Sequence, residues 1–227
     1  MKYTPFTKIH ESLGAKMAEF AGYYMPIQYT GIQEEHIGVR EKVGVFDVSH
    51  MGEIYIKGPN ALDFAQYVTS NDVAALKDGK VQYSCFPNGK GGIVDDLLVY
   101  RINEQEYLLV VNAANIEKDW NWLCSHAPNF NIEINKNLIN DSDNTAQLAI
   151  QGPLAMKVMQ KIVAEPITDM TYYTWQWVTL DGIKNVLLST TGYTGSGGCE
   201  IYFNPKYAEQ IWHAIFEAGK DEGIIPV

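Results

Sequence analysis

Cysteine is scarce in this 227-residue chain, which holds only Cys85, Cys124 and Cys199. The number is odd and the spacings are not those of a metal site, so the sequence argues against a disulfide framework and a zinc centre and favours a reducing compartment. No apolar run reaches membrane length, and no signal-peptide core follows Met1. These absences together predict a cytoplasmic protein that has no membrane segment.

Basic residues are also few, with 17 Lys and Arg against 27 Asp and Glu, and the formal net charge is -10. No basic stripe is present, and nucleic-acid binding requires clustered positive charge, so a nucleic-acid partner is not expected. The hydrophobic fraction of 46% is ordinary for a folded protein. The length suits one large domain or two small ones.

One design occurs twice along the chain. A strand pattern leads into a helix start at Gly58-Pro59, and the same pattern recurs at Gly152-Pro153, 94 residues later. A later strand in each copy ends at an asparagine, Asn112 and then Asn204, 92 residues apart, and a helix follows. Each copy reads strand, helix, two or three strands, helix, which predicts an α+β fold of ferredoxin-like, split β-α-β-β-α-β repeats. Each asparagine is expected to cap the helix after it.

Local patterns predict the other elements. Apolar spacing indicates a helix over residues 7–20, interrupted at Gly14, a loop over 22–26 and a helix over 31–43. Asp181-Gly182 predicts a hairpin between strands at 175–180 and 183–190. The polar segment 135–144 is the expected boundary between the copies. Asp47, Ser49 and His50 are too close on one short strand to converge as a catalytic triad.

Two adjacent acids follow a glycine turn in residues 89–101 and begin an apolar strand. Side chains alternate across a strand, so Asp96 shares a face with Leu98 and Tyr100 and should be partly desolvated. Burial raises the pKa of a carboxyl group and suits it to proton transfer near neutrality. Asp95 would then bond the glycine turn. The alternative is that both acids are turn carboxylates at a hairpin.

A second glycine-rich stretch, residues 190–200, ends one strand and opens another. Its glycines allow a flat ligand to approach the backbone, while Tyr193 offers a stacking face. Glu200 could accept two parallel hydrogen bonds from an amidine-like edge such as that of a pterin. The alternative is a long glycine hairpin with an ordinary surface glutamate.

Motifs at residues 20–22, 25–26, 44–52, 91–96, 111–113, 151–153 and 191–195 resemble, in order, those of the aminomethyltransferases. These are the T-proteins of the glycine cleavage system, and the resemblance runs from the N-terminus to Val227. It implies an enzyme that binds tetrahydrofolate and takes an aminomethyl group from the lipoyl arm of the H-protein. The reaction would release ammonia and give 5,10-methylenetetrahydrofolate, and no metal is implied.

The same resemblance assigns site residues. Asp96 would lie beside the reacting folate nitrogens and assist proton transfer as nitrogen attacks the methylene carbon. Tyr193 and Glu200 would hold the pterin. The pocket would be lined by Met51, Tyr83, Tyr100, Asn112 and Tyr173. Simple core packing is the alternative for Tyr83 and Tyr173, since the chain holds 14 tyrosines.

The resemblance further implies a folate-binding GcvT-type fold of two interleaved antiparallel-sheet domains with helices on one face. The first would comprise residues 1–52 and 141–227 and the second residues 53–140. Folate would bind between them, and the lipoyl arm would enter from the Met51 side.

Two departures from the family pattern bear on function. The family usually has Glu-Asp-Gly-Phe-Glu where this chain has Ser196-Gly-Gly-Cys-Glu200. Family members also continue past Val227 into an arginine-bearing motif and a C-terminal β-barrel domain, so a fragment is expected. The rival interpretations are a folate-dependent demethylase relative and a non-catalytic folate-binding paralogue. The second acid of the Asp95-Asp96 pair favours catalysis.

Overall fold

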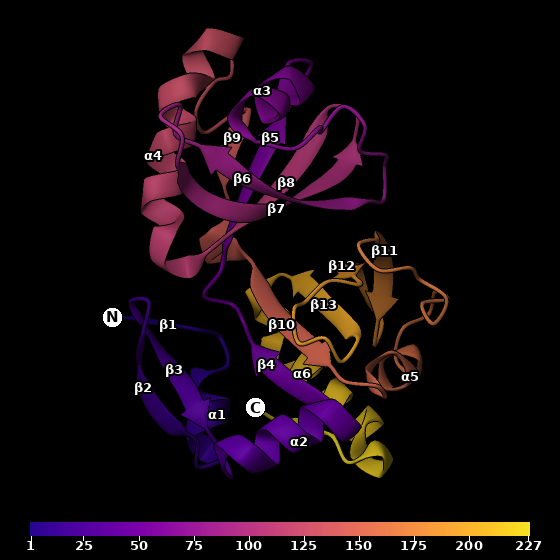
Figure 1. Ribbon diagram of the computed structural model, residues 1–227. Helices are drawn as coiled ribbons and strands as arrows, with labels where there is room; N and C mark the ends of the chain where they lie inside the picture. The colour runs from indigo at the N-terminus through magenta and orange to yellow at the C-terminus, as the bar shows by residue number, and fades with distance from the viewer. The chain divides into compact units, whose positions relative to one another are not determined.

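The chain builds part of one unit, leaves it to form a second, and then returns to complete the first (Figure 1). The computed structural model describes residues 1–227. The first unit comprises Met1–His50 and Thr145–Val227, and the second Met51–Asn144. The division implied by the family resemblance put the boundaries at residues 52–53 and 140–141. The α+β fold predicted from the sequence is confirmed.

The second unit is a five-stranded antiparallel sheet with two helices on one face, as Figure 1 shows. Its elements are β5 (Gly52–Lys57), α3 (Ala61–Val68), β6 (Val81–Pro87), β7 (Ile93–Asn103), β8 (Glu106–Val111), α4 (Ile116–His126) and β9 (Leu138–Asn140). The strand order is β6-β7-β8-β5-β9, so the first strand of the copy lies between the last two. This is the ferredoxin-like order with β6 added at the edge.

Alternation along β7 decides which side chains of this unit enter the core. Leu97 and Val99 are buried and pack with Phe64 of α3 and Leu123 of α4. Asp95 has the same parity as Leu97, so it points to the helix-covered face of the sheet. Asp96 points to the opposite face.

The first unit repeats the design. It contains β10 (Ala146–Gln151), α5 (Ala155–Gln160), β11 (Trp175–Leu180), β12 (Ile183–Ser189), β13 (Gly198–Phe203) and α6 (Ala208–Ala218). Two further strands, β4 (Gly44–Asp47) and β14 (Ile225–Pro226), complete the order β11-β12-β13-β10-β4-β14. Strand β4 pairs with β10 as β9 pairs with β5, so the repeat inferred from the sequence is present in the structure.

The N-terminal segment corrects two local predictions. It forms β1 (Lys2–Tyr3), α1 (Thr7–Ser12), β2 (Lys16–Phe20), β3 (Tyr23–Gln28) and α2 (Ile32–Glu41). The helix expected over 7–20 therefore ends at Ser12, and the loop expected over 22–26 is wrong, because β3 pairs there with β2. Ala21 and Gly22 both have positive φ, which makes a tight hairpin, and Tyr23 and Met25 are buried in alternation.

The other local predictions fare better. The hairpin at 181–182 is confirmed, and both turn residues have positive φ, as a type I′ turn requires. The helix expected over 31–43 is α2. The boundary segment 135–144 is more ordered than its polarity indicates, since it holds β9. The longest helices have 11 residues, and none is long and apolar enough to span a membrane.

Candidate functional site

The Asp96 carboxylate is held by two hydrogen-bond donors, one on the neighbouring strand β6 and one directly after the end of β8. Strand pairing places Cys85 of β6 opposite Asp96, so Tyr83 lies on the same face of the sheet. The Tyr83 hydroxyl donates to Asp96 Oδ2 at 2.7 Å, and Asn112 Nδ2 donates to Asp96 Oδ1 at 2.7 Å. Asp96 is half-buried and Tyr83 is 52% exposed. The carboxylate thus has a fixed orientation on a face that a ligand can approach.

Asp95 is the more buried acid, at 7% exposure. It was expected to bond the glycine turn, and this is wrong. Asn112 Nδ2 lies 3.2 Å from both of its carboxylate oxygens. The turn is closed instead by Asn88, whose side-chain oxygen accepts from the backbone amides of Lys90 and Gly92.

Asn112 therefore does not cap the helix that follows it, contrary to expectation. Its amide is directed at the two acids and also lies 3.2 Å from the backbone oxygen of Asp96. Asn204, its counterpart in the repeat, does act as a cap and accepts from the backbone amide of Lys206 at 3.2 Å. The two asparagines have different hydrogen-bond partners because carboxylates lie beside Asn112 in the second unit.

A third acid, Asp119 on α4, completes this cluster and was missed in the sequence. Its side chain is fully buried, neither of its oxygens has a hydrogen-bond partner, and the carboxyl group of Asp95 acts on it. Burial raises the pKa of Asp119 to about 8, and the neighbouring, negatively charged carboxyl group of Asp95 contributes to the rise, while Lys118 opposes it. One sequence signal was present, because Asp119 shares helical spacing with Ile116 and Leu123 on the apolar face.

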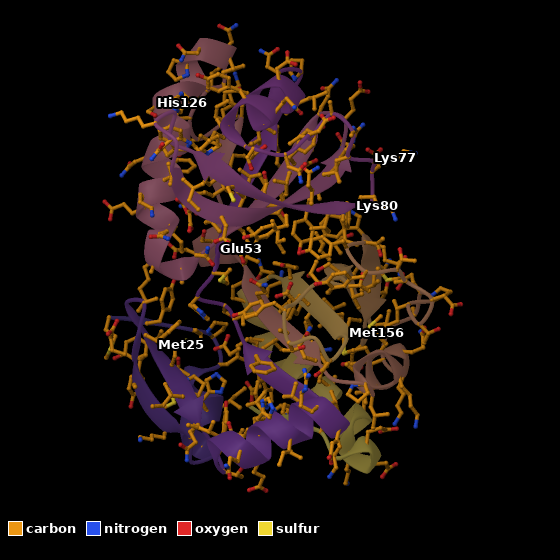
Figure 2. All side chains as sticks on the ribbon, viewed as in Figure 1. Met25, Glu53, Lys77, Lys80, His126 and Met156 are labelled. Atoms are coloured by element: carbon orange, nitrogen blue, oxygen red, sulfur yellow. The ribbon has the colours of Figure 1, made fainter.

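Two more of the expected site residues lie on the same unit as Asp96. Tyr100 is four residues beyond Asp96 on β7, has the same parity and is fully buried. Half-buried Met51 precedes β5, and the pairing of Gly52 with Val111 puts it at the end of the sheet where Asn112 lies. Glu53, labelled in Figure 2, marks this start of β5.

In the first unit, Glu200 on β13 is 9% exposed rather than an ordinary surface glutamate. Its Oε2 accepts from the Thr191 hydroxyl, and its Oε1 accepts from Gln147 Nε2 at 3.2 Å. Burial raises the pKa of Glu200, and the two hydrogen bonds partly oppose this. Each oxygen of a carboxylate accepts about two hydrogen bonds, so each retains one acceptor position.

The glycine-rich loop beside Glu200 is held by side chains from distant segments. Arg40 Nη1 donates to the Thr194 carbonyl at 2.6 Å and to Ser196 Oγ at 2.9 Å. The Thr194 hydroxyl donates to Gln151 Oε1 at 2.8 Å. Tyr193, between these anchored residues, is 100% exposed, so its ring is fully accessible.

Tyr173 lies near this loop and has an unusual backbone, with a φ of 62°. Its ring makes an edge contact with Tyr172 at 4.5 Å, and the Tyr172 hydroxyl donates to the Gly192 carbonyl at 2.9 Å. Burial raises the pKa of Tyr173, and the Tyr172 hydroxyl and the Glu200 charge add to this. Tyr173, Tyr193 and Glu200 thus belong to one end of the first unit's sheet.

The Asp47-Ser49-His50 stretch does not assemble as a triad. Asp47 Oδ2 bonds the buried ring of His10 at 3.0 Å and the Thr4 hydroxyl at 2.6 Å. The Ser49 hydroxyl donates to the Gln147 carbonyl at 3.1 Å, so it is engaged with the backbone of β10. These bonds tie the N-terminal segment to the sheet.

Comparison with known proteins places this arrangement in a family. Residues 6–227 match the model of the GCVT N-terminal domain. The chain is 60% identical over 227 residues to an aminomethyltransferase of Bacteroides fragilis, covering 100% of this chain and 62% of that protein. It is 56% identical to an aminomethyltransferase of Porphyromonas gingivalis, with 61% of that protein covered. The chain therefore spans about three fifths of the length of these relatives.

Solved structures agree with the fold. The crystal structure of glycine cleavage system aminomethyltransferase T from Bartonella henselae matches with a TM-score of 0.87 and 32% identity, over 100% of this chain and 59% of that one. A chain of heterotetrameric sarcosine oxidase from Corynebacterium sp. U-96 matches with a TM-score of 0.62 at 16% identity, over 99% of this chain and 97% of that one. The second likeness concerns the fold alone.

Proposed function

Because the chain belongs to the GCVT N-terminal domain family, we propose that it carries the tetrahydrofolate-binding residues of an aminomethyltransferase. The reaction moves the methylene of an aminomethyl group from the lipoyl arm of an H-protein to tetrahydrofolate. Ammonia leaves and 5,10-methylenetetrahydrofolate forms. The observation that carries the proposal is the Asp96 carboxylate, oriented at both oxygens by Tyr83 and Asn112 at 2.7 Å.

Asp96 is the acid–base group of the proposed reaction. Two folate nitrogens each form a bond to the methylene carbon and lose a proton. The bonds from that carbon to the amine and to the lipoyl sulfur break, and each of these leaving groups gains one proton. A carboxylate with a fixed orientation beside the attacking nitrogen can take up the first proton. Tyr83 and Asn112 keep the carboxylate from rotating, so its geometry is set before folate arrives.

Glu200 is the proposed pterin anchor. Each of its oxygens has one internal donor, from Thr191 and from Gln147, and one remaining acceptor position. A ring N–H and an exocyclic amine form two parallel donors that match those positions. Tyr193 and Tyr173, on the same unit as Glu200, supply aromatic surface for the flat ring.

The partner of this reaction is a lipoylated H-protein, and the compartment is the cytoplasm. The support for the partner is the family match and the Bartonella henselae relative, which is a protein of the glycine cleavage system. A non-catalytic folate-binding role or a demethylase-related role is the alternative. An assay of transfer, rather than binding alone, separates these functions.

The test is formation of 5,10-methylenetetrahydrofolate from aminomethylated H-protein and tetrahydrofolate. Replacing Asp96 with Asn removes the proton acceptor but keeps the shape, so the rate should fall by about 10² to 10⁴. Asp63→Asn is the matched control, since Asp63 is exposed on α3 of the same unit. It should leave the rate unchanged. Equal rates for Asp96→Asn and Asp63→Asn would remove the catalytic assignment.

A further inference from the structure

Beyond the residues of the proposed reaction, we propose that Asp119 is a positioning residue that shares a single proton with Asp95. The protonated pair orients the Asn112 amide, which in turn fixes the Asp96 carboxylate. The part of the inference that concerns catalysis, the orientation of Asp96, rests on the proposed function. The shared proton itself does not depend on folate.

The surroundings of Asp119 require that proton. The side chain is fully buried on α4, which packs on β7, and Asp95 on that strand is the acid that acts on it most strongly. Neither oxygen of Asp119 is reached by an N–H or hydroxyl donor. Two neighbouring ionised carboxylates without a donor would repel each other strongly in a buried site. One proton between the two carboxyl groups removes this repulsion and satisfies both with a hydrogen bond.

Three charged groups act on Asp119. Asp95 faces it from β7, Asp96 acts on it from the opposite face of that strand, and Lys118 is its neighbour on α4. Lys118 does not neutralise the pair directly, because its Nζ donates to the Val94 carbonyl at 2.6 Å. Burial and the two negative neighbours together raise the pKa of Asp119 to about 8, so it is protonated at neutral pH.

Asn112 connects this pair to Asp96. Its amide contacts both oxygens of Asp95 at 3.2 Å and Asp96 Oδ1 at 2.7 Å. While the pair holds the proton, it carries a single negative charge, and the amide can serve both Asp95 and Asp96. Loss of the proton above pH 8 adds a second charge behind Asp95, which draws the amide toward Asp95 and weakens its hold on Asp96.

The test is a pH titration by nuclear magnetic resonance of the chain labelled with ¹³C at aspartate carboxyls and ¹⁵N at asparagine amides. One aspartate carboxyl should be protonated at pH 7 and titrate with an apparent pKa near 8. The Asn112 side-chain amide should shift with the same apparent pKa. If every aspartate carboxyl is ionised at pH 7, the proposal is overturned without any variant being needed.

Two variants assign the signals. Asp119→Asn imitates the protonated acid, so it should abolish both the titration near pH 8 and the shift of the Asn112 amide. Glu117→Gln, on the exposed side of the same helix, should change neither. If the Asn112 side-chain amide resonance does not shift while Asp119 titrates, then the pair does not orient Asn112 and the proposal is overturned. Folate titration of the same samples tests the proposed function separately, since the titration near pH 8 is measured without ligand.

Discussion

Replacing Asp119 with Asn should change how stability depends on pH. In the folded chain burial and Asp95 raise the pKa of Asp119 to about 8, whereas an unfolded aspartate has a pKa of about 3.9. Between these values the folded state binds one more proton than the unfolded state. The free energy of unfolding therefore falls as pH rises, by about 1.4 kcal/mol per pH unit from this group, and the fall ends above pH 8.

Asparagine removes this proton while keeping a donor for Asp95. The stability of wild type relative to Asp119→Asn should thus decline by about 3 kcal/mol between pH 5 and pH 7. Urea unfolding followed by tryptophan fluorescence, at half-unit steps from about pH 5 to pH 9, measures the difference. For the exposed control Glu117→Gln, the free energy of unfolding should depend on pH in the same way as for wild type. Parallel curves for wild type and Asp119→Asn over the same pH range would refute the shared proton.

Three further substitutions test the Glu200 end of the first unit. Gly198→Ala should destabilise the fold much more than Gly197→Ala. Both glycines have positive φ, but only a Cβ at position 198 would collide with a backbone oxygen, that of Ile150. Thermal unfolding should show a loss of about 1–2 kcal/mol for Gly197→Ala and several times more for Gly198→Ala, and similar losses would contradict the packing. Thr191→Val removes a donor from buried Glu200 and should cost about 1–3 kcal/mol in urea unfolding at pH 7, whereas no loss would show that the hydroxyl does not support the carboxylate.

The sequence predicted correctly those elements whose conformation is set by residues next to one another in the chain. The Asp181-Gly182 turn has the φ values that its residues favour, and the Gly-Pro helix starts marked both copies of the repeat. The N-terminal helix prediction failed because residues 16–20 can satisfy helical spacing, yet the turn at Ala21-Gly22 pairs them with β3. Tertiary pairing overrode a weak local periodicity.

The candidate site shows the same limit. The adjacent acids and the glycine loop were visible in the sequence, and alternation correctly separated the two acids onto opposite faces of β7. It did not show that Asp95 is the more buried of the two. Asn112 was assigned to a helix cap because capping is a local preference, whereas its observed partners are acids 16 and 17 residues away. Asp119 was missed because only packing of α4 on β7 brings its carboxyl to Asp95.

The most direct measurement is the ¹³C resonance of the Asp96 carboxylate during titration of the chain with tetrahydrofolate, with the signal identified by its loss in Asp96→Asn. The account predicts a shift of this resonance that saturates together with the quenching of tryptophan fluorescence by bound folate. Saturable folate binding that leaves the Asp96 resonance unmoved would contradict the account, as would a chain that binds no folate.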